Sequence, residues 1–272
     1  MATSSAPPQV KDEDPINWAE LPSELMASIL VRLSVVDILE NAQKVCKPWR
    51  CVSKDRSIWR KVDMQNLRNG LNSGKYYLSN MCRQAIDRSD GGMVEINIGR
   101  FGTDSLLTYI ADRSSNLRSL KFAMNVRITN EGLVLAVAKL PLLETLEISS
   151  LWFNLNLKAI GHSCPKLKTL KLNCSDCCRF EYKCDDDDAL AIAESMPELR
   201  ELQLLANRLT NTGLNAILDN CLHLEHLDLR QCLNINLSEG DMEKRCLERI
   251  KDFRRPNDST ADCPFYVAFS FR

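Results

Sequence analysis

The stretch from Pro197 to Cys221, PELRELQLLANRLTNTGLNAILDNC, changes its apolar period half way along. Its first half, LRELQL, spaces leucines as a β-strand does, whereas its second half, LNAIL, has the three- and four-residue spacing of a helix. A unit of one short strand and one short helix is too small to bury its own apolar face. Further units of the same kind must therefore stack on both sides of it.

The same six-residue pattern, aliphatic-x-x-aliphatic-x-aliphatic or aromatic, recurs along the chain. The copies begin at Met93, Leu117, Leu143, Leu167, Leu199 and Leu224. Their starts are separated by 24, 26, 24, 32 and 25 residues, and five such similar steps do not arise by chance. Asn125, Asn207 and Cys232 stand where leucine-rich repeats carry Asn or Cys, a position from which a side chain can hydrogen-bond the turning backbone. The pattern predicts an α/β solenoid of about six leucine-rich repeats over residues 93–250.

Composition limits where the chain acts and on what. The hydrophobic fraction of 44% and the charged fraction of 26% are those of a globular protein. A net charge of −1 favours neither nucleic acid nor an anionic membrane as a partner, and no apolar run has the length of a membrane helix. The first residues lack the pattern of a signal peptide, so we expect the protein in the nucleus, the cytoplasm or both. There the twelve cysteines are expected to be reduced thiols, many of them buried.

The segments outside the repeats divide into four parts. Residues 1–14 are polar and contain proline, and we expect a disordered leader. Residues 15–64 contain three short segments with helical spacing, a small core that usually needs outside support. Residues 65–92 are expected to join the two parts and to cap the array with a helix. Residues 251–272 form either an end cap or a loose tail.

Residues 15–64 resemble an F-box. The resemblance rests on residues at the spacing of that motif: Leu21, Pro22, Glu24, Leu25, Ile29, Leu30, Leu33, Asp37, Leu39, Val45, Cys46, Lys47, Trp49, Arg50 and Trp59. With the repeats, the chain from Trp18 to about Ile250 resembles the F-box/leucine-rich-repeat proteins, most closely those of plants. That resemblance implies a substrate receptor of an SCF-type ubiquitin ligase, without catalysis of its own. The F-box would dock on a Skp-type adaptor, and through it on cullin and RING subunits.

The resemblance implies an adaptor-binding set within this module. Its members are Leu21, Pro22, Leu25, Ile29, Leu30, Leu33, Val45 and Trp49. Packing in a helical core is the alternative for Leu30, Leu33, Val45 and Trp59. Leu21 and Pro22 precede the first helix, where the fold has less need of them, so contact with a partner is favoured there.

We call the aliphatic positions of the six-residue pattern the ladder. The residues between them are expected to line the concave wall of the solenoid, because side chains alternate along a strand. One of these rows comprises Gly99, Ala123, Ser149, Asn173, Leu205 and Arg230. The rows mix charge and polarity, which suits a protein segment better than lipid or nucleic acid. We assign substrate binding to Lys171, Glu201, Gln203, Leu205, His226, Asp228 and Arg230, with Leu205 as an apolar anchor.

The 32-residue step contains an insertion that offers another substrate site, Cys174 to Asp188. Four of its cysteines raise the question of zinc: Cys174, Cys177, Cys178 and Cys184. A zinc site usually has two well-separated pairs of cysteines, and here the second pair is missing. A loop with free thiols is therefore favoured over a metal site. The acidic run Asp185–Asp188 is interpreted as a helix start in which Asp187 or Asp188 is the cap.

Catalysis finds no support in the sequence. His162, His223 and His226 stand in no nucleophile or metal motif, and no glycine-rich phosphate loop occurs. We therefore expect no active site and no cofactor. The alternative to a ligase receptor is a repeat scaffold that binds protein without any link to ubiquitination.

Overall fold

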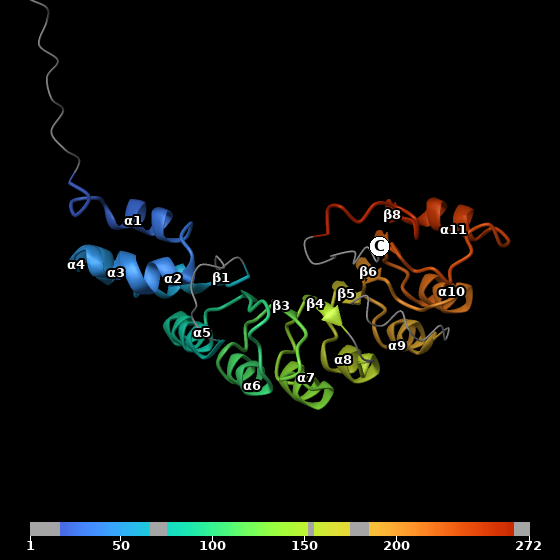
Figure 1. Cartoon of the computed structure of the whole chain (residues 1–272), viewed down its shortest axis with the longest axis horizontal. Coiled ribbons are helices and arrows are strands. Elements are labelled where there is room, and N and C mark those ends of the chain that lie inside the picture. The colour runs from blue at the N-terminus through green and yellow to red at the C-terminus, as the bar shows by residue number, and fades with distance from the viewer. Residues whose placement is uncertain (1–16, 66–74, 152–154, 175–184, 264–272) are drawn as a thin grey trace, which may run out of the picture.

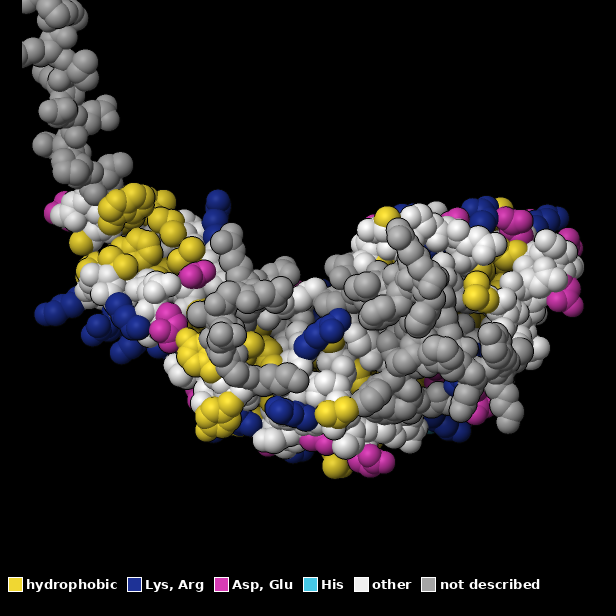
Figure 2. Space-filling view, viewed as in Figure 1, with side chains coloured by type: hydrophobic (Ala, Val, Ile, Leu, Met, Phe, Trp, Pro, Cys, Tyr) yellow, Lys and Arg dark blue, Asp and Glu magenta, His cyan; other side chains and the backbone are white. Residues whose placement is uncertain are grey.

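The computed structural model describes residues 17–65, 75–151, 155–174 and 185–263. A helical N-terminal module leads into a curved array with strands on its inner wall and helices on its outer wall (Figure 1). The inner side is hollowed between the two ends of the chain (Figure 2). The predicted leader, Cys177, Cys178, Cys184 and the residues after 263 lie outside the described ranges.

Short helical segments build the N-terminal module. They are α1 (Ser23–Leu30), α2 (Val35–Asp37), the π-helical η1 (Ile38–Ala42), α3 (Gln43–Val45), α4 (Lys47–Val52) and the 3-10 helix η2 (Arg56–Trp59). Ser34 caps α2 by accepting a hydrogen bond from the Asp37 amide, and Pro48 stands in the first turn of α4, where its missing N–H costs nothing. Trp59 is buried, and its indole donates to the Ser53 carbonyl at 2.9 Å.

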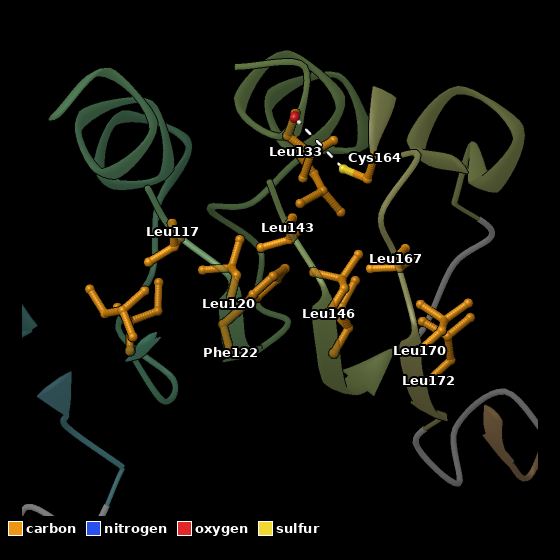
Figure 3. Close-up of a cluster of buried hydrophobic side chains, with 14 of the residues drawn as sticks. Leu117, Leu120, Phe122, Leu133, Leu143, Leu146, Cys164, Leu167, Leu170 and Leu172 are labelled. Carbon is orange, nitrogen blue, oxygen red and sulfur yellow. Dashed lines mark hydrogen bonds between the residues drawn. The ribbon is translucent and has the colours of Figure 1, made fainter. Parts of the chain in front are cut away.

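Within the described ranges, eight parallel strands form one sheet in chain order. They are β1 (Lys61–Asp63), β2 (Glu95–Asn97), β3 (Ser119–Ala123), β4 (Thr145–Leu151), β5 (Thr169–Cys174), β6 (Glu201–Leu205), β7 (His226–Asp228) and β8 (Asp252–Arg254). Leu146, Leu170, Leu202 and Leu227 are register partners on successive strands, and all are buried. Figure 3 shows several of these ladder side chains directed into the space between strands and helices. The predicted leucine-rich-repeat solenoid is confirmed.

The helices lie outside the sheet. They are α5 (Lys75–Ser89), α6 (Asp104–Arg113), α7 (Asn130–Val137), α8 (Leu157–Ser163), α9 (Asp187–Ser195), α10 (Asn211–Asn220) and α11 (Met242–Arg249). Thr129 and Thr210 cap α7 and α10 by accepting from the amides of Gly132 and Thr212. The cysteines described are free thiols, and five of them are buried, including Cys164 at the end of α8.

The sheet extends one strand beyond the predicted ladder at each end. At its start, β1 lies within the segment assigned to the helical module, and it pairs with β2. At its far end, β8 begins after residue 250 and pairs with β7. Residues 65–92, predicted to form a linker with a capping helix, contribute α5, which packs beside α6 on the outer wall.

Arg88 on α5 ties the module to the array. Its guanidinium donates to the Gln43 side chain at 2.8 Å and to the Ser53 carbonyl at 3.3 Å, and it lies 5.4 Å from the centre of a Trp59 ring. The buried residues of the module and of the repeats belong to one apolar cluster. The two parts are therefore held in a fixed relation by side-chain packing.

Gly132 in α7 and Gly213 in α10 leave room for a carboxylate from the start of an adjacent helix to approach and accept hydrogen bonds. Asp186, which precedes α9, accepts from both the amide and the hydroxyl of Thr210, each at 2.7 Å, and Asp104 of α6 does the same for Thr129. A Cβ on Gly213 would lie 2.4 Å from a carboxylate oxygen of Asp186. This close approach explains the glycine in the Thr-Asn-x-Gly motif that opens α10.

The acidic run at the start of α9 differs from the sequence interpretation. Neither Asp187 nor Asp188 is the cap, because Asp186 precedes the helix and turns its side chain to Thr210. Asp185 accepts from the Asp187 amide at 3.0 Å instead. Asp188 is half-buried beside Asn207, whose side-chain amide donates to it at 3.2 Å. Burial raises the pKa of Asp188 to about 6, although the hydrogen bond from Asn207 opposes the rise.

Replacing Asp188 by Asn is therefore expected to stabilise the protein at pH 7.5. The pKa of Asp188 is near 3.8 in an unfolded chain and about 6 in the folded one, so stability is lost as pH rises from about 4 to 6. Asp188→Asn removes an ionised carboxylate while keeping an acceptor for Asn207. We expect a gain of about 1–3 kcal/mol at pH 7.5 that almost disappears at pH 3.5, measured by urea denaturation. Asp187→Asn, at an exposed position, is the control, and an equal gain at both pH values would contradict the assignment.

Candidate functional site

An apolar face is exposed on the N-terminal module. Its members from the predicted adaptor set are Pro22, Leu25, Leu33 and Val45, with Leu21 and Ile29 half-buried beside them. Leu25 is 51% exposed and Val45 is 62% exposed. Figure 2 shows hydrophobic side chains gathered over this end of the molecule. We call the exposed and half-buried side chains of this set, together with Trp18 and Val31, the apolar face.

Leu30 and Trp49 do not belong to that face. Leu30 is fully buried and Trp49 is 8% exposed, so neither side chain is available to a partner. The Trp49 indole donates to the Trp18 carbonyl at 3.0 Å, which fixes the chain ahead of α1 against α4. Both residues hold the module's core, and their assignment as direct adaptor contacts is wrong.

Two exposed members of the face were missed from the sequence. Trp18 precedes the recognised motif, and Val31 follows the last residue of α1. Neither lies on the buried stripe of α1, which consists of Met26 and Leu30. A large apolar residue out of phase with a helix's buried stripe was the signal that could have found Val31.

The concave wall has two accessible rows and one buried row. Thr169, Glu201 and His226 lie in the first row, and Lys171, Gln203 and Asp228 lie in the second; these six are half-buried or exposed. The predicted third row is buried throughout, from Gly99 to Arg230. Its members stand at or beside the turn by which each strand leaves the sheet, where φ is positive at Gly99, Ser150, Ala206 and Gln231.

Both Leu205 and Arg230 are buried, so Leu205 is misplaced in the predicted substrate surface, whereas Arg230 still contributes to the lining of the hollow described below. Leu205 is 1% exposed and Arg230 is 4% exposed. Arg230 donates from Nε and Nη2 to the Asp228 carboxylate at 3.0 and 2.7 Å, and from Nη1 to the Ser259 carbonyl at 2.7 Å. It also pairs with Asp262. Hydrogen bonding to Asp228 raises the pKa of Arg230 against the opposing effect of burial.

The remaining predicted residues meet at the carboxyl-terminal end of the wall. Lys171 pairs with Glu201 across adjacent strands, and Gln203 donates to the Asn173 side chain. His226 is exposed, with Nδ1 3.7 Å from an Asp252 oxygen. A polar hollow of about 170 Å³ is lined by residues of β6, β7 and β8, among them Glu201, Gln203, His226 and Asp228. Asp252 and Arg254 also line it, and sequence reasoning missed them because it did not predict β8.

Within the described ranges, no group of three or more His, Cys, Asp or Glu side chains is placed to hold a metal ion. Three of the four insertion cysteines lie outside those ranges. Of the helices in the described part of the chain, none has both the length and the apolar character that a bilayer crossing needs.

Comparison with known proteins bears on both ends of the chain. Residues 18–65 match the model of the F-box-like family. The chain is 59% identical to the putative F-box/LRR-repeat protein 23 of Arabidopsis thaliana over 95% of its own length, and it spans 58% of that relative. It is 57% identical to the putative F-box/LRR-repeat protein 21 of the same plant, covering 92% of this chain and 84% of the relative. It is 56% identical to the Arabidopsis F-box protein SKIP19, covering 96% and 85%.

Proposed function

We propose that this chain, which belongs to the F-box/leucine-rich-repeat proteins, is the substrate-recognition subunit of an SCF-type ubiquitin ligase. The observation that carries the proposal is the apolar face, which lies exposed on the segment that matches the F-box-like family. Exposed apolar side chains gathered in one place are typical of a surface that a partner covers. In this role the chain is a receptor, and other subunits of the ligase catalyse ubiquitin transfer.

The partner proposed for the apolar face is a Skp-type adaptor, which would connect the chain to cullin and RING subunits. Leu25 and Val45 are the most suitable anchors, since each has more than half of its surface exposed. Burying a fully exposed Leu or Val side chain contributes about 1.5–3 kcal/mol, so each of these two half-exposed side chains would contribute about 1 kcal/mol or more. The fixed junction at Arg88 would then hold the repeats at a set distance from the adaptor.

The partner proposed for the concave wall is a protein substrate. Glu201, Gln203, His226 and Asp228 line one hollow with carboxylate, amide and imidazole groups, and Lys171 pairs with Glu201 beside it. Such a surface is suited to hydrogen-bonding a polypeptide segment, and we propose that this happens in the nucleus or cytoplasm. A repeat scaffold without a link to ubiquitination is the alternative, and it differs in having no adaptor on the apolar face.

We expect Leu25→Asp combined with Val45→Asp to weaken capture of a recombinant Skp-type adaptor strongly. Two charges placed in an apolar interface must be desolvated without a partner, so binding should weaken by at least about tenfold. The matched control is Leu135→Asp combined with Leu222→Asp, which changes two equally exposed leucines on the array. Circular dichroism and thermal melting would verify that both double variants fold.

The same experiment tests the concave wall. Lys171→Ala, Gln203→Ala and His226→Ala together should keep the adaptor and lose the proteins captured from plant extract with the proteasome blocked. Deleting residues 175–184 tests whether the insertion, the alternative substrate site, binds these proteins instead. If captured proteins disappear with that deletion and persist in the triple variant, the concave wall is not the substrate site. If the wild-type chain captures proteins but no adaptor, the scaffold alternative holds.

A further inference from the structure

The segment from Gln43 to Val62 carries a concentrated positive charge. It has seven basic residues and one acidic residue, Asp55, a net charge of +6 within twenty residues. The whole chain has a net charge of −1, so the rest of it carries −7. The basic residues of the segment are Lys44, Lys47, Arg50, Lys54, Arg56, Arg60 and Lys61.

Packing turns these charges outward. Trp49, Ile58 and Trp59 of the same segment are buried in the module, which leaves the opposite sides of α4 and η2 to solvent. Lys47 and Arg50 lie three residues apart in α4, the spacing of one helix face, and Lys54 follows the end of that helix; all three are exposed. Arg56 and Arg60, at the two ends of η2, are exposed as well. We call these five residues the basic face.

The fold does not neutralise the basic face. Lys44 and Lys61, at the ends of the segment, pair with Glu40 and Glu95. The five residues of the basic face have no carboxylate within 4.0 Å among residues 17–65 or the other described ranges. The Arg50 guanidinium donates to a backbone carbonyl, that of Gln43, at 3.1 Å. Like charges held on one small module repel one another, so their clustering does not serve the stability of the module.

The basic face borders the apolar face. Val45, an exposed member of the apolar face, stands two residues before Lys47. Trp18, another member, is bound through its carbonyl to Trp49, which lies between Lys47 and Arg50 in α4. Figure 2 shows Lys and Arg side chains gathered at the same end of the molecule as the hydrophobic ones. A single partner seated on the apolar face would therefore lie beside the basic face.

We infer that the basic face binds an acidic segment of the same protein that docks on the apolar face. This inference rests on the proposed adaptor docking and gives that adaptor a chemical requirement, a run of carboxylates beside its apolar contact. Nucleic acid is a less suitable occupant. The two tryptophans of this segment are buried, whereas single-strand binders stack bases on exposed aromatic rings, and the rest of the chain repels a polyanion.

The test measures adaptor affinity at 50 and 300 mM salt for Lys47→Glu, Arg50→Glu and Lys54→Glu combined. At 50 mM salt we expect binding at least tenfold weaker than wild type, and a smaller loss of affinity between the two salt concentrations. The matched control combines Arg100→Glu, Arg127→Glu and Lys166→Glu, three exposed basic residues of the array. It changes the net charge by the same amount and should bind within about twofold of wild type.

Each outcome separates this inference from the proposed function. If the basic-face variant binds the adaptor as tightly as the wild type does at both salt concentrations, the inference is overturned and adaptor docking on the apolar face still stands. A wild-type chain that does not bind the adaptor overturns both. Should the glutamate variant fail to fold, Lys47→Gln, Arg50→Gln and Lys54→Gln combined makes the same test, with a weaker but still salt-dependent loss. If the variant loses binding to a labelled 20-base-pair DNA duplex and keeps the adaptor, the basic face is a nucleic-acid site and the inference is wrong.

Discussion

Replacing Leu170 by Ala is expected to lower the free energy of unfolding by about 2–5 kcal/mol. Leu170 is fully buried in β5, with Leu146 and Leu202 as its register partners on the two neighbouring strands. Figure 3 shows its side chain beside that of Leu172, and both are buried between the strands and the helices. Because repeats flank this position on both sides, the array has little freedom to collapse into the cavity left by the missing methyl groups.

The cost should depend on position in the array. Leu202→Ala, also in the interior, is expected to resemble Leu170→Ala. Leu227→Ala should fall at the low end of the range, since its outer partner is Phe253 of the last strand, which is only half-buried and can move inward. Leu190→Ala, at an exposed position of α9, is the control and should cost less than about 1 kcal/mol. Urea denaturation monitored by circular dichroism would measure all four, and equal values for Leu170 and Leu190 would refute the repeat register.

The ladder was predictable from sequence because the same short spacing of apolar residues recurs in every repeat and marks the buried positions. The two terminal strands were not. β1 and β8 have three residues each, and each has a single apolar residue, Val62 or Phe253, in register with the ladder. A pattern that short has no period of its own. These strands form because the neighbouring strand presents an unpaired edge.

The exposure of the candidate site residues was predicted correctly where it depends only on a residue's position along its strand. The first-row and second-row positions of β5, β6 and β7 are accessible, as the alternation of side chains along a strand predicts. Alternation does not predict the turn that buries the third row at Leu205 and Arg230. On the helical module the division between core and surface depends on how short segments pack. Leu30 is buried whereas Leu33, three residues on and after the end of α1, is exposed.

Arg230 has a structural role that its sequence position does not suggest, and its removal is expected to be costly. The side chain joins β7 to the segment after β8, through hydrogen bonds to Asp228, a hydrogen bond to the Ser259 carbonyl and the pair with Asp262. Breaking a buried pair by removing one partner typically costs about 3–5 kcal/mol, because the other charge stays buried. Arg230→Met should therefore destabilise the carboxyl-terminal end of the array by that amount and leave the adaptor-binding end intact.

Three further measurements separate this role from an ordinary surface pair. Lys251→Ala, which removes an exposed pair with Glu225 in the same part of the array, should cost less than about 1 kcal/mol. Arg230→Met combined with Asp228→Asn should be more stable than Arg230→Met alone, because no unpaired buried charge remains. Hydrogen exchange should show faster opening around residues 252–263 in Arg230→Met, since those residues lose their tether to β7. A variant with wild-type stability and unchanged exchange would mean that Arg230 does not hold the carboxyl-terminal segment, and its place on the substrate surface would then have to be reconsidered.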